Sequence, residues 1–355
     1  MGASGIRILL LADSHLGFDL PVRPRIDRPR RGHDFFANYE RALQIALDQR
    51  VHAVVHGGDV FYRSRVPAAL VQRAFVPLKR VAEQGIPVVV VPGNHERSRI
   101  PHDLLALHPG IHVFDRPRTF KLQLDGAEVA FGGFPCQRRD VRRAFPGLVA
   151  ASGLPATPAP IRLLCIHQSV EGATVGPAEY TFRYADDVVR GADIPTGIAA
   201  VLAGHIHRHQ VLTTDLRGRP FAAPVLYPGS LERTAFAEAG ETKGVVLLEV
   251  LPDAEGGRLA SWQFVELPTR PMIVSEIDAQ RLDGVGMEGA LQRAMAAAPP
   301  DAVLRLRVIG HVPAAARPAL RAAAVRAMAP PTMVVEVRNV EDAPQPYASG
   351  GDTPA

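Results

Sequence analysis

Residues 53–61 read AVVHGGDVF, and this stretch decides the fold. A short run rich in β-branched residues ends in two glycines, and Asp59 follows at the tip of the predicted strand. In an open α/β sheet, ligands gather outside the carboxyl ends of the strands, so a side chain just past a strand is directed at the site. A single aspartate in this place is usually a turn former or a helix cap. Four other predicted strands end in comparable side chains, and together these strand ends predict a functional site.

Strands and helices alternate around this stretch. Continuous apolar runs predict buried strands at 6–12 and 86–91 on either side of the strand from Ala53, and helical spacing predicts helices at 34–49 and 66–84. This βαβαβ order, with crossovers of helical length, is typical of a mostly parallel sheet. Further buried strands are predicted at 161–166, 198–203 and 244–250, and shorter runs predict antiparallel strands at 111–114, 119–124 and 128–133 that lead to a second sheet.

The fold class predicted from this order is α/β, with two sheets packed as a sandwich, helices flanking them and a small C-terminal α+β domain. Residues 1–252 form the predicted first domain. Strand-like and helical runs that follow the turn-rich segment PDAEGG predict a second domain at 258–340, including a helix at 314–328. The tail at 341–355 lacks apolar periodicity and is predicted to be disordered.

Composition limits the classes of protein to consider. The 355 residues carry a formal net charge of +4, which is compatible with a polyanionic partner but does not require one. Two cysteines cannot make a disulfide framework, which favours a reducing cytosol. The apolar run near the N-terminus is too short for a signal-peptide core or a membrane span. We therefore expect a soluble cytoplasmic protein that is not attached to a membrane.

The strand ends carry side chains that bind metals or move protons: Asp13 and His15, Asp59, Asn94 and His95, His167, and His205 with His207. Residues i and i+2 of a strand face the same way, so the two members of D-x-H or of G-H-x-H can converge on one point. Imidazole and carboxylate ligands without a thiolate favour manganese, iron or zinc. A lone histidine beside a glycine turn is more often a hydrogen-bonded loop residue, but the pieces together predict a metal site. Their number suits two ions that share one carboxylate.

The order D-x-H, G-D, G-N-H-E, a single histidine and G-H-x-H resembles the calcineurin-like metallophosphoesterase superfamily over roughly the first 250 residues. Within it, GDVF at 58–61, GNHE at 93–96 and YPGSLER at 227–233, with KG at 243–244, resemble the SbcD-type nuclease subunit of double-strand-break repair. The small domain after residue 257 resembles that family's DNA-capping domain by its layout. The resemblance implies a metal-dependent phosphoesterase that acts on DNA as an exonuclease, with endonuclease activity as a further expectation.

The resemblance also implies a role for each ligand. The first ion would be held by Asp13, His15, Asp59 and His207, and the second by Asp59, Asn94, His167 and His205, with Asp59 as the bridge. His95 would contact the scissile phosphate and protonate the leaving oxygen. The family usually uses manganese. Tyr62 stands where many relatives have a histidine or an aspartate; it can hydrogen-bond a phosphate but cannot act as an imidazolium, which puts a second catalytic histidine in doubt.

Arginines near these motifs are candidates for contacts with DNA. A Pro-rich loop carries Arg23, Arg25, Arg28, Arg30 and Arg31, and further arginines follow the central motifs, among them Arg63 and Arg97. A solvated loop is the plain interpretation, and contact with phosphates beside the site is the alternative, since neutralising phosphates drives non-specific DNA affinity. The group Arg138, Arg139, Arg142 and Arg143 is predicted to decorate an exposed helix face.

The sequence is also compatible with two other functions. A phosphodiesterase or phosphatase for small nucleotides or phosphoesters would use the same metal centre, and a non-catalytic scaffold for DNA ends is a third class. The resemblance further implies an SbcC-like ABC ATPase partner and a homodimer. A helical docking segment for the ATPase is not evident in the sequence, so that partnership is left open.

Overall fold

The computed structural model describes residues 5–19, 31–96 and 108–339. The described chain divides into two compact units, the first ending at Thr269 and the second beginning at Arg270. None of the helices in these ranges is long and apolar enough to cross a membrane.

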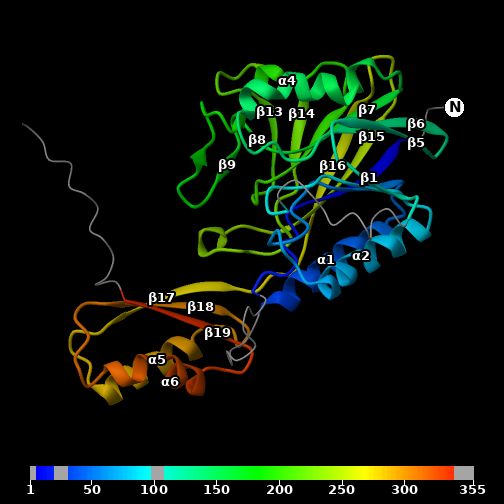
Figure 1. The fold of residues 1–355 in the computed structure, drawn as a ribbon. Coiled ribbons are helices and arrows are strands. Elements are labelled where there is room, and N and C mark those ends of the chain that lie inside the picture. Colours follow the sequence, from blue (N-terminus) through cyan, green and yellow to red (C-terminus); the bar gives the residue numbers. More distant parts are fainter. Residues whose placement is uncertain (1–4, 20–30, 97–107, 340–355) are drawn as a thin grey trace, which may run out of the picture. The chain divides into compact units, whose positions relative to one another are not determined.

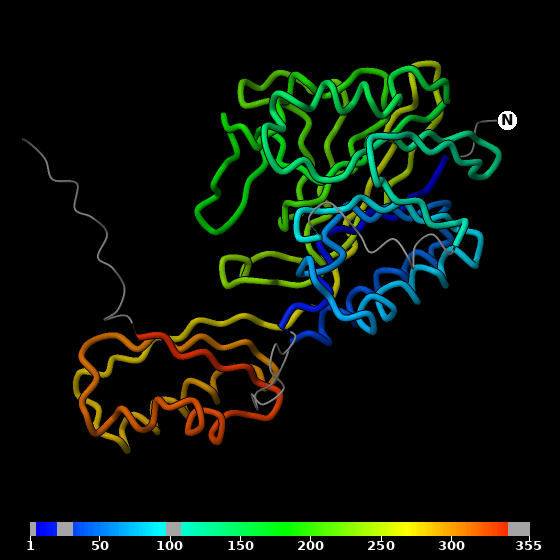
Figure 2. Tube along the Cα trace, viewed as in Figure 1, coloured from blue at the N-terminus to red at the C-terminus, as the bar shows by residue number. Residues whose placement is uncertain are grey.

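The first unit (Figure 1) contains two six-stranded sheets. The first of them includes the strand that precedes Asp59. Strands β1, β2, β3 and β4 pair with their neighbours in parallel. On the other side of β1, β15 pairs with it in antiparallel fashion, and β16 pairs with β15 in the same way. The trace in Figure 2 shows the blue first strand beside the yellow strands from residues 244–266, far along the chain. In sheet order, the strands are β16 (Arg258–Glu266), β15 (Gly244–Leu251), β1 (Ile6–Leu11), β2 (Ala53–His56), β3 (Val88–Val90) and β4 (Ile111–Val113).

Helices α1 (Gly32–Asp48) and α2 (Ala68–Glu83) cover the outer face of this sheet. Each helix buries one apolar stripe, and the two stripes share a core with alternate residues of the strands, such as Leu9 and Leu11 of β1. Pro67 precedes α2, where its missing N–H costs no helical hydrogen bond. Both faces of β1 are buried, which explains why its sequence is a continuous apolar run.

The second sheet supplies the other side of the sandwich. Strands β14, β12, β7 and β6 run parallel, and β13 and β5 are antiparallel edge strands. Helix α4 (Val141–Ser152) packs on its outer face. In sheet order, the strands are β13 (Gln210–Thr214), β14 (Pro220–Tyr227), β12 (Ala200–Gly204), β7 (Ile161–His167), β6 (Ala127–Gly133) and β5 (Arg118–Leu124).

The inner faces of the two sheets share one apolar core. Ile8 and Leu10 of β1 lie in the same buried cluster as Phe131 of β6 and Leu163 of β7. This packing confirms the predicted two-sheet sandwich with flanking helices, and it brings the carboxyl ends of parallel strands from both sheets to one region.

Short elements complete the unit: β8 (Ser169–Val170), β9 (Thr174–Val175), β10 (Tyr180–Thr181), β11 (Val188–Val189), and the 3-10 turns η1 (Leu154–Ala156), η2 (Gly191–Asp193) and η3 (Phe236–Glu238).

The second unit has its own three-stranded parallel sheet and its own core. Its helices pack on one face of that sheet, where Met287 and Leu291 of α5 meet Leu304 and Leu306 of the central strand (Figure 1). The elements are β17 (Met272–Asp278), α5 (Gly284–Ala296), β18 (Val303–Ile309), η4 (Arg317–Leu320), α6 (Ala322–Met328) and β19 (Val334–Asn339).

Three details differ from the sequence-based expectations. The segment 258–266, expected at the start of the second domain, forms β16 and pairs with β15 in the first unit. The segment 111–114, expected to be antiparallel, supplies β4, which is parallel to β3. The helix expected at 314–328 is divided into η4 and α6 around Arg321, whose backbone is extended. Short runs carry little information about pairing direction, because strand direction is decided by tertiary contacts.

Candidate metal centre

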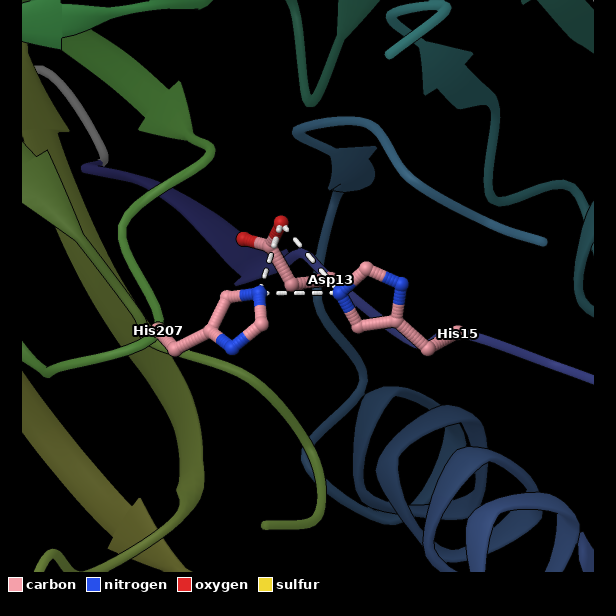
Figure 3. A group of neighbouring side chains, drawn as sticks. All are labelled: Asp13, His15 and His207. Carbon is pink, nitrogen blue, oxygen red and sulfur yellow. Dashed lines mark hydrogen bonds and ion pairs between the residues drawn. The ribbon is translucent and has the colours of Figure 1, made fainter. Parts of the chain in front are cut away.

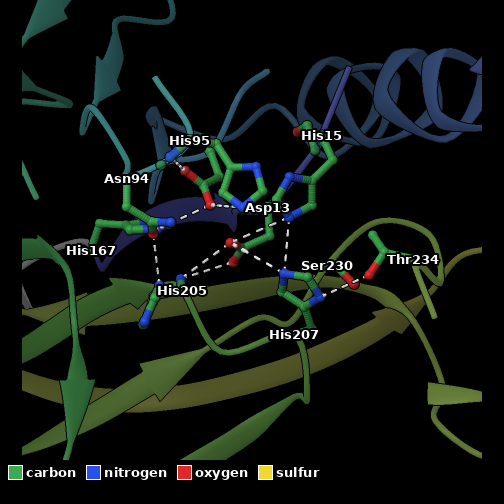
Figure 4. A network of polar contacts seen from close by, with 12 residues as sticks. Asp13, His15, Asn94, His95, His167, His205, His207, Ser230 and Thr234 are labelled. Atoms are coloured by element: carbon green, nitrogen blue, oxygen red, sulfur yellow. Dashed lines mark hydrogen bonds and ion pairs between the residues drawn. The ribbon is translucent and has the colours of Figure 1, made fainter. Parts of the chain in front are cut away.

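The predicted ligands converge at the carboxyl ends of adjacent strands in both sheets (Figure 4). Asp13, Asp59 and Asn94 follow the neighbouring strands β1, β2 and β3, while His167 ends β7 and His205 follows β12. The two sheets touch here, since the Nδ1–H of His167 donates to the carbonyl of Gly57 at 2.8 Å. Residues up to two hundred positions apart therefore meet at one place.

One group of ligand atoms comes from Asp13, His15 and His207 (Figure 3). The Nε2 atoms of His15 and His207 are 2.9 Å apart. An Asp13 carboxylate oxygen lies 4.0 Å from the Nε2 of His15 and 3.9 Å from that of His207. All three side chains point toward a common centre.

A second group surrounds Asp59. Its Oδ2 lies 3.4 Å from the Nε2 of His167, and Asp13, Asp59 and His167 form a further cluster of possible ligand atoms. The Asn94 Oδ1 lies 3.0 Å from the Nε2 of His167 and 2.9 Å from the Nδ1 of His205. The backbone N–H of His205 donates to Asp13 at 3.0 Å. Asp59 and Asp13 thus stand between the two sets of histidines.

Several residues of the candidate metal centre have a left-handed backbone conformation, which sets the direction of their side chains. Asp13, His15, Asp59 and His205 all have φ between 45° and 89°, a region that such residues rarely adopt. Strain of this kind, about 1–3 kcal/mol per residue, persists only where the surroundings impose it, and it clusters at functional sites. Gly93 has a related role, because a Cβ there would lie 2.1 Å from the Asp59 Oδ1. The glycine allows the Asn94 loop to approach Asp59.

Charges in the cluster are strongly coupled. Burial alone would favour neutral forms, but His167 outweighs it at Asp59 and lowers the pKa of that carboxyl. Conversely, Asp59 overcomes the effect of burial on His167 and raises its pKa to about 9. Burial raises the pKa of Asp13 to about 6. Burial and the nearby His167 lower the pKa of His205 to about 3. Without a metal ion, these shifts favour a protonated His167 beside an ionised Asp59. A bound cation would take the place of that proton.

This donor set fits divalent metal ions. Ions bound at about 2.1 Å from each ligand place neighbouring ligand atoms about 3–4 Å apart, and the ligand atoms of each cluster here lie within 4.8 Å of one another. Two imidazole nitrogens that face each other at 2.9 Å are compatible when a shared proton or cation lies between them. Asp13, His15, Asp59 and His207 could hold one ion, and Asp59, Asn94, His167 and His205 could hold a second.

His95 lies beside the cluster with its side chain 33% exposed. Its Nδ1–H donates to the Tyr62 carbonyl at 2.7 Å, which leaves Nε2 directed toward Asp59 at 3.9 Å. Its backbone N–H donates to the Asp59 Oδ1 at 2.9 Å. The Tyr62 ring lies next to the rings of His15 and His95, with centroid distances of 5.8 and 5.5 Å. His95 therefore presents its Nε2 at the accessible side of the centre.

His207 is held in place by Glu238, which the sequence analysis did not single out, and by Lys243, which it quoted only as part of the KG motif. Glu238 accepts a hydrogen bond from the His207 Nδ1 at 3.1 Å, which directs the Nε2 lone pair at the centre. Lys243 is fully buried; its Nζ lies 2.8 Å from Glu238, 2.9 Å from Glu241 and 2.8 Å from the His207 carbonyl. These contacts lower the pKa of Glu238 despite its burial. Glu238 ends the short turn η3, in the segment FAE, and no pattern in that segment marks this role.

Glu96 supports the other side. Its two carboxylate oxygens accept hydrogen bonds from the backbone N–H groups of Phe61, at 2.6 Å, and Gly93, at 2.8 Å. These bonds join the loop that carries Asp59 to the loop that carries Asn94. Burial and the Asp59 charge raise the pKa of Glu96 to about 8.

The predicted DNA-contact arginines are placed differently. Arg31 is buried, donates to the Arg233 carbonyl at 2.8 Å and pairs with Glu232 at 3.3 Å, so its guanidinium is used inside the protein. Arg63 is exposed near the Tyr62 ring. The other candidates, Arg23, Arg25, Arg28, Arg30 and Arg97, lie outside the described residues.

The sequence is similar to one protein family and to several named proteins. Residues 6–209 match the calcineurin-like phosphoesterase family. The chain is 27% identical to a protein of Bacillus subtilis (strain 168) that is named as a subunit of the SbcCD nuclease, over 76% of this chain and 71% of that protein. It is 28% identical to "DNA double-strand break repair protein Mre11" of Haloferax volcanii, over 95% of this chain and 68% of that protein, and 25% identical to the Aeropyrum pernix protein of the same name, over 81% and 67%.

The matched segment covers more than half of the chain and includes every predicted ligand from Asp13 to His207. The sequence-based prediction of a metal-dependent phosphoesterase is thereby confirmed at the level of the family. The chain belongs to the calcineurin-like phosphoesterase family.

Proposed function

We propose that this protein is a two-metal phosphodiesterase that cleaves DNA in repair, as an exonuclease and also as an endonuclease, with manganese as the metal. The observation that carries the proposal is the convergence of Asp13, His15, Asp59, Asn94, His167, His205 and His207 at one edge of the sandwich. The similarity to relatives named for a nuclease and for DNA double-strand break repair supports DNA as the substrate.

In this proposal each residue has a defined task. Bound divalent ions would neutralise the phosphoryl oxygens and acidify a water molecule so that it can attack near neutral pH. His95 donates a proton from Nε2 to the leaving oxygen, and the Tyr62 carbonyl fixes the orientation of its ring. Glu96 and Glu238 hold the loops and ring orientations on which the ligand geometry depends.

The first unit would act as the nuclease domain and the second as a DNA-capping domain. The relative from B. subtilis is named as one subunit of a nuclease, which supports including an SbcC-like ATPase among the candidate partners. A second candidate function, hydrolysis of small phosphoesters, would use the same ligands and His95.

The deciding experiment is an assay of the purified protein with manganese. Labelled duplex and single-stranded DNA would be offered beside bis-p-nitrophenyl phosphate. We expect cleavage of all three that stops when the metal is chelated. Hydrolysis of the small ester without any DNA cleavage would favour the second candidate function, and no hydrolysis at all would refute both.

A further inference from the structure

A pocket of about 670 Å³ lies one strand further along both sheets than the candidate metal centre. In the first sheet, β4 comes next to β3 and runs parallel to it, so Arg116 follows a strand end at the same edge as Asn94. In the second sheet, β6 comes next to β7 and is also parallel, so residues 134–139 follow a strand end at the same edge as His167. Both of these strand ends line the pocket.

Cys136 joins the pocket to the loops of the metal centre. Its backbone N–H donates to the carbonyl of Pro92, two residues before Asn94, at 2.8 Å. The Gln168 amide, next to His167, donates to the Cys136 Sγ at 3.9 Å. The buried side of the pocket is therefore formed by a residue that contacts two ligand-bearing segments.

The pocket carries an excess of positive charge. Arg116, Arg138 and Arg139 line it, and all three are exposed. Asp115 is the carboxylate of the lining, and it lies 3.0 Å from Arg118 and 3.7 Å from Arg116. Within the described ranges, no carboxylate lies at ion-pair distance from Arg138 or Arg139. A bound anion would give these two guanidinium groups a negatively charged partner.

The two arginines lie apart from the helix face on which the sequence had placed them. Helix α4 begins at Val141, so Arg138 and Arg139 belong to the segment between β6 and the helix. The next arginines are engaged elsewhere: Arg142 lies 4.0 Å from the Tyr184 ring, and Arg143 pairs with Asp140 at 3.7 Å.

We propose that this pocket binds backbone phosphates of the nucleic-acid strand next to the phosphate that is cleaved. The inference rests on the proposed function and adds a substrate class to it: an oligonucleotide long enough to reach from the metal centre to the neighbouring strand ends. Planar guanidinium groups match phosphate oxygens in a bidentate way. A small phosphoester would occupy the metal centre alone and gain nothing from the pocket.

The test compares two double variants with the same change in net charge. Arg138→Glu with Arg139→Glu alters the pocket, and Arg143→Glu with Arg217→Glu alters exposed arginines outside its lining. Binding of a labelled single-stranded oligonucleotide is measured by fluorescence anisotropy with calcium in place of manganese. Hydrolysis of bis-p-nitrophenyl phosphate with manganese is measured on the same preparations.

We expect the pocket variant to bind the oligonucleotide about tenfold to a hundredfold more weakly than the control variant, because two charged hydrogen-bonding groups are lost. Its kcat/KM for the small ester should equal that of the unchanged protein. The dependence of log Kd on log salt should also become shallower, by about 1.4 for the loss of two phosphate contacts with a single strand. Equal oligonucleotide affinity in the two variants would overturn the proposal, and so would failure of the unchanged protein to bind the oligonucleotide.

A milder variant covers the case in which charge reversal disturbs the fold. Arg138→Gln with Arg139→Gln removes the charge and keeps polar side chains. If this variant loses hydrolysis of the small ester as well, the pocket belongs to the metal centre and the proposal fails. In the unchanged protein, affinity should rise with oligonucleotide length between about 4 and about 16 nucleotides, and this rise should be smaller in the glutamine variant. The proposed function fails by a separate result, namely no manganese-dependent hydrolysis of either ester by the unchanged protein.

Discussion

At the scale of single residues, the orientation of His207 depends on Glu238, and a matched pair of variants tests this. Glu238→Gln removes the carboxylate that accepts from the His207 Nδ1, whereas Glu241→Gln alters a carboxylate that contacts Lys243 and Arg208. We predict about 10–100-fold weaker manganese binding for Glu238→Gln, because partners of this kind orient metal-ligating histidines. Isothermal titration gives the affinity. Equal affinities in the two variants would contradict the role of Glu238.

His95 is predicted to affect turnover without affecting metal content. It contacts the Asp59 carboxylate through its backbone N–H, which an alanine retains, while its imidazole carries the proton. We expect His95→Ala to keep both ions and to lose about 10²–10⁴-fold in kcat. His33→Ala, which removes an exposed histidine on α1, serves as the control. Metal content is measured by elemental analysis, and loss of metal in His95→Ala would refute the assignment.

The sequence indicated which side chains converge at the candidate metal centre, but it did not indicate that Glu238 orients one of them. Asp13 with His15 and His205 with His207 are recognisable because strand periodicity and glycine turns mark them. Glu238 and Lys243 act through tertiary contacts across a loop, which leave no periodic pattern. Arg31 belonged to an arginine-rich loop in the sequence, yet its guanidinium pairs with Glu232 in the interior.

At the scale of elements, the close approach of two loops sets the site. A methyl group at Gly93 would collide with the Asp59 side chain and with its backbone nitrogen, at 2.1 and 2.4 Å. We predict that Gly93→Ala lowers the free energy of unfolding by about 1–3 kcal/mol and weakens metal binding. Gly147→Ala, in α4 with no atom within 4 Å of the added Cβ, should be neutral or stabilising. Chemical denaturation measures both, and equal stabilities would contradict the packing argument.

The long central elements were predictable because their patterns are strong. The strands at 6–12 and 53–56 stand out as continuous apolar runs, and the helices α1 and α2 stand out by their helical spacing of apolar residues. The pairing of strand β4 could not be predicted from the sequence. Its three residues carry too little pattern to show that it pairs with β3 in parallel.

At the scale of the whole molecule, the boundary at Thr269 suggests that the first unit can stand alone. The last residues of the first unit form hydrogen bonds within that unit. The Asn38 side chain donates to the Pro268 carbonyl at 2.9 Å, and the Leu267 N–H donates to the Lys243 carbonyl. We predict that a chain ending at Thr269 folds and hydrolyses bis-p-nitrophenyl phosphate at about the full rate, while its DNA affinity falls. Loss of folding would show that the second unit is required for stability.

In the proposed function, residues from two sheets form one binuclear centre, and anomalous X-ray scattering from crystals grown with manganese would locate its ions. We predict two manganese peaks per chain, both within bonding distance of Asp59, with His15 and His207 at one and Asn94, His167 and His205 at the other. A single peak away from Asp59, or no peak near these side chains, would contradict the account.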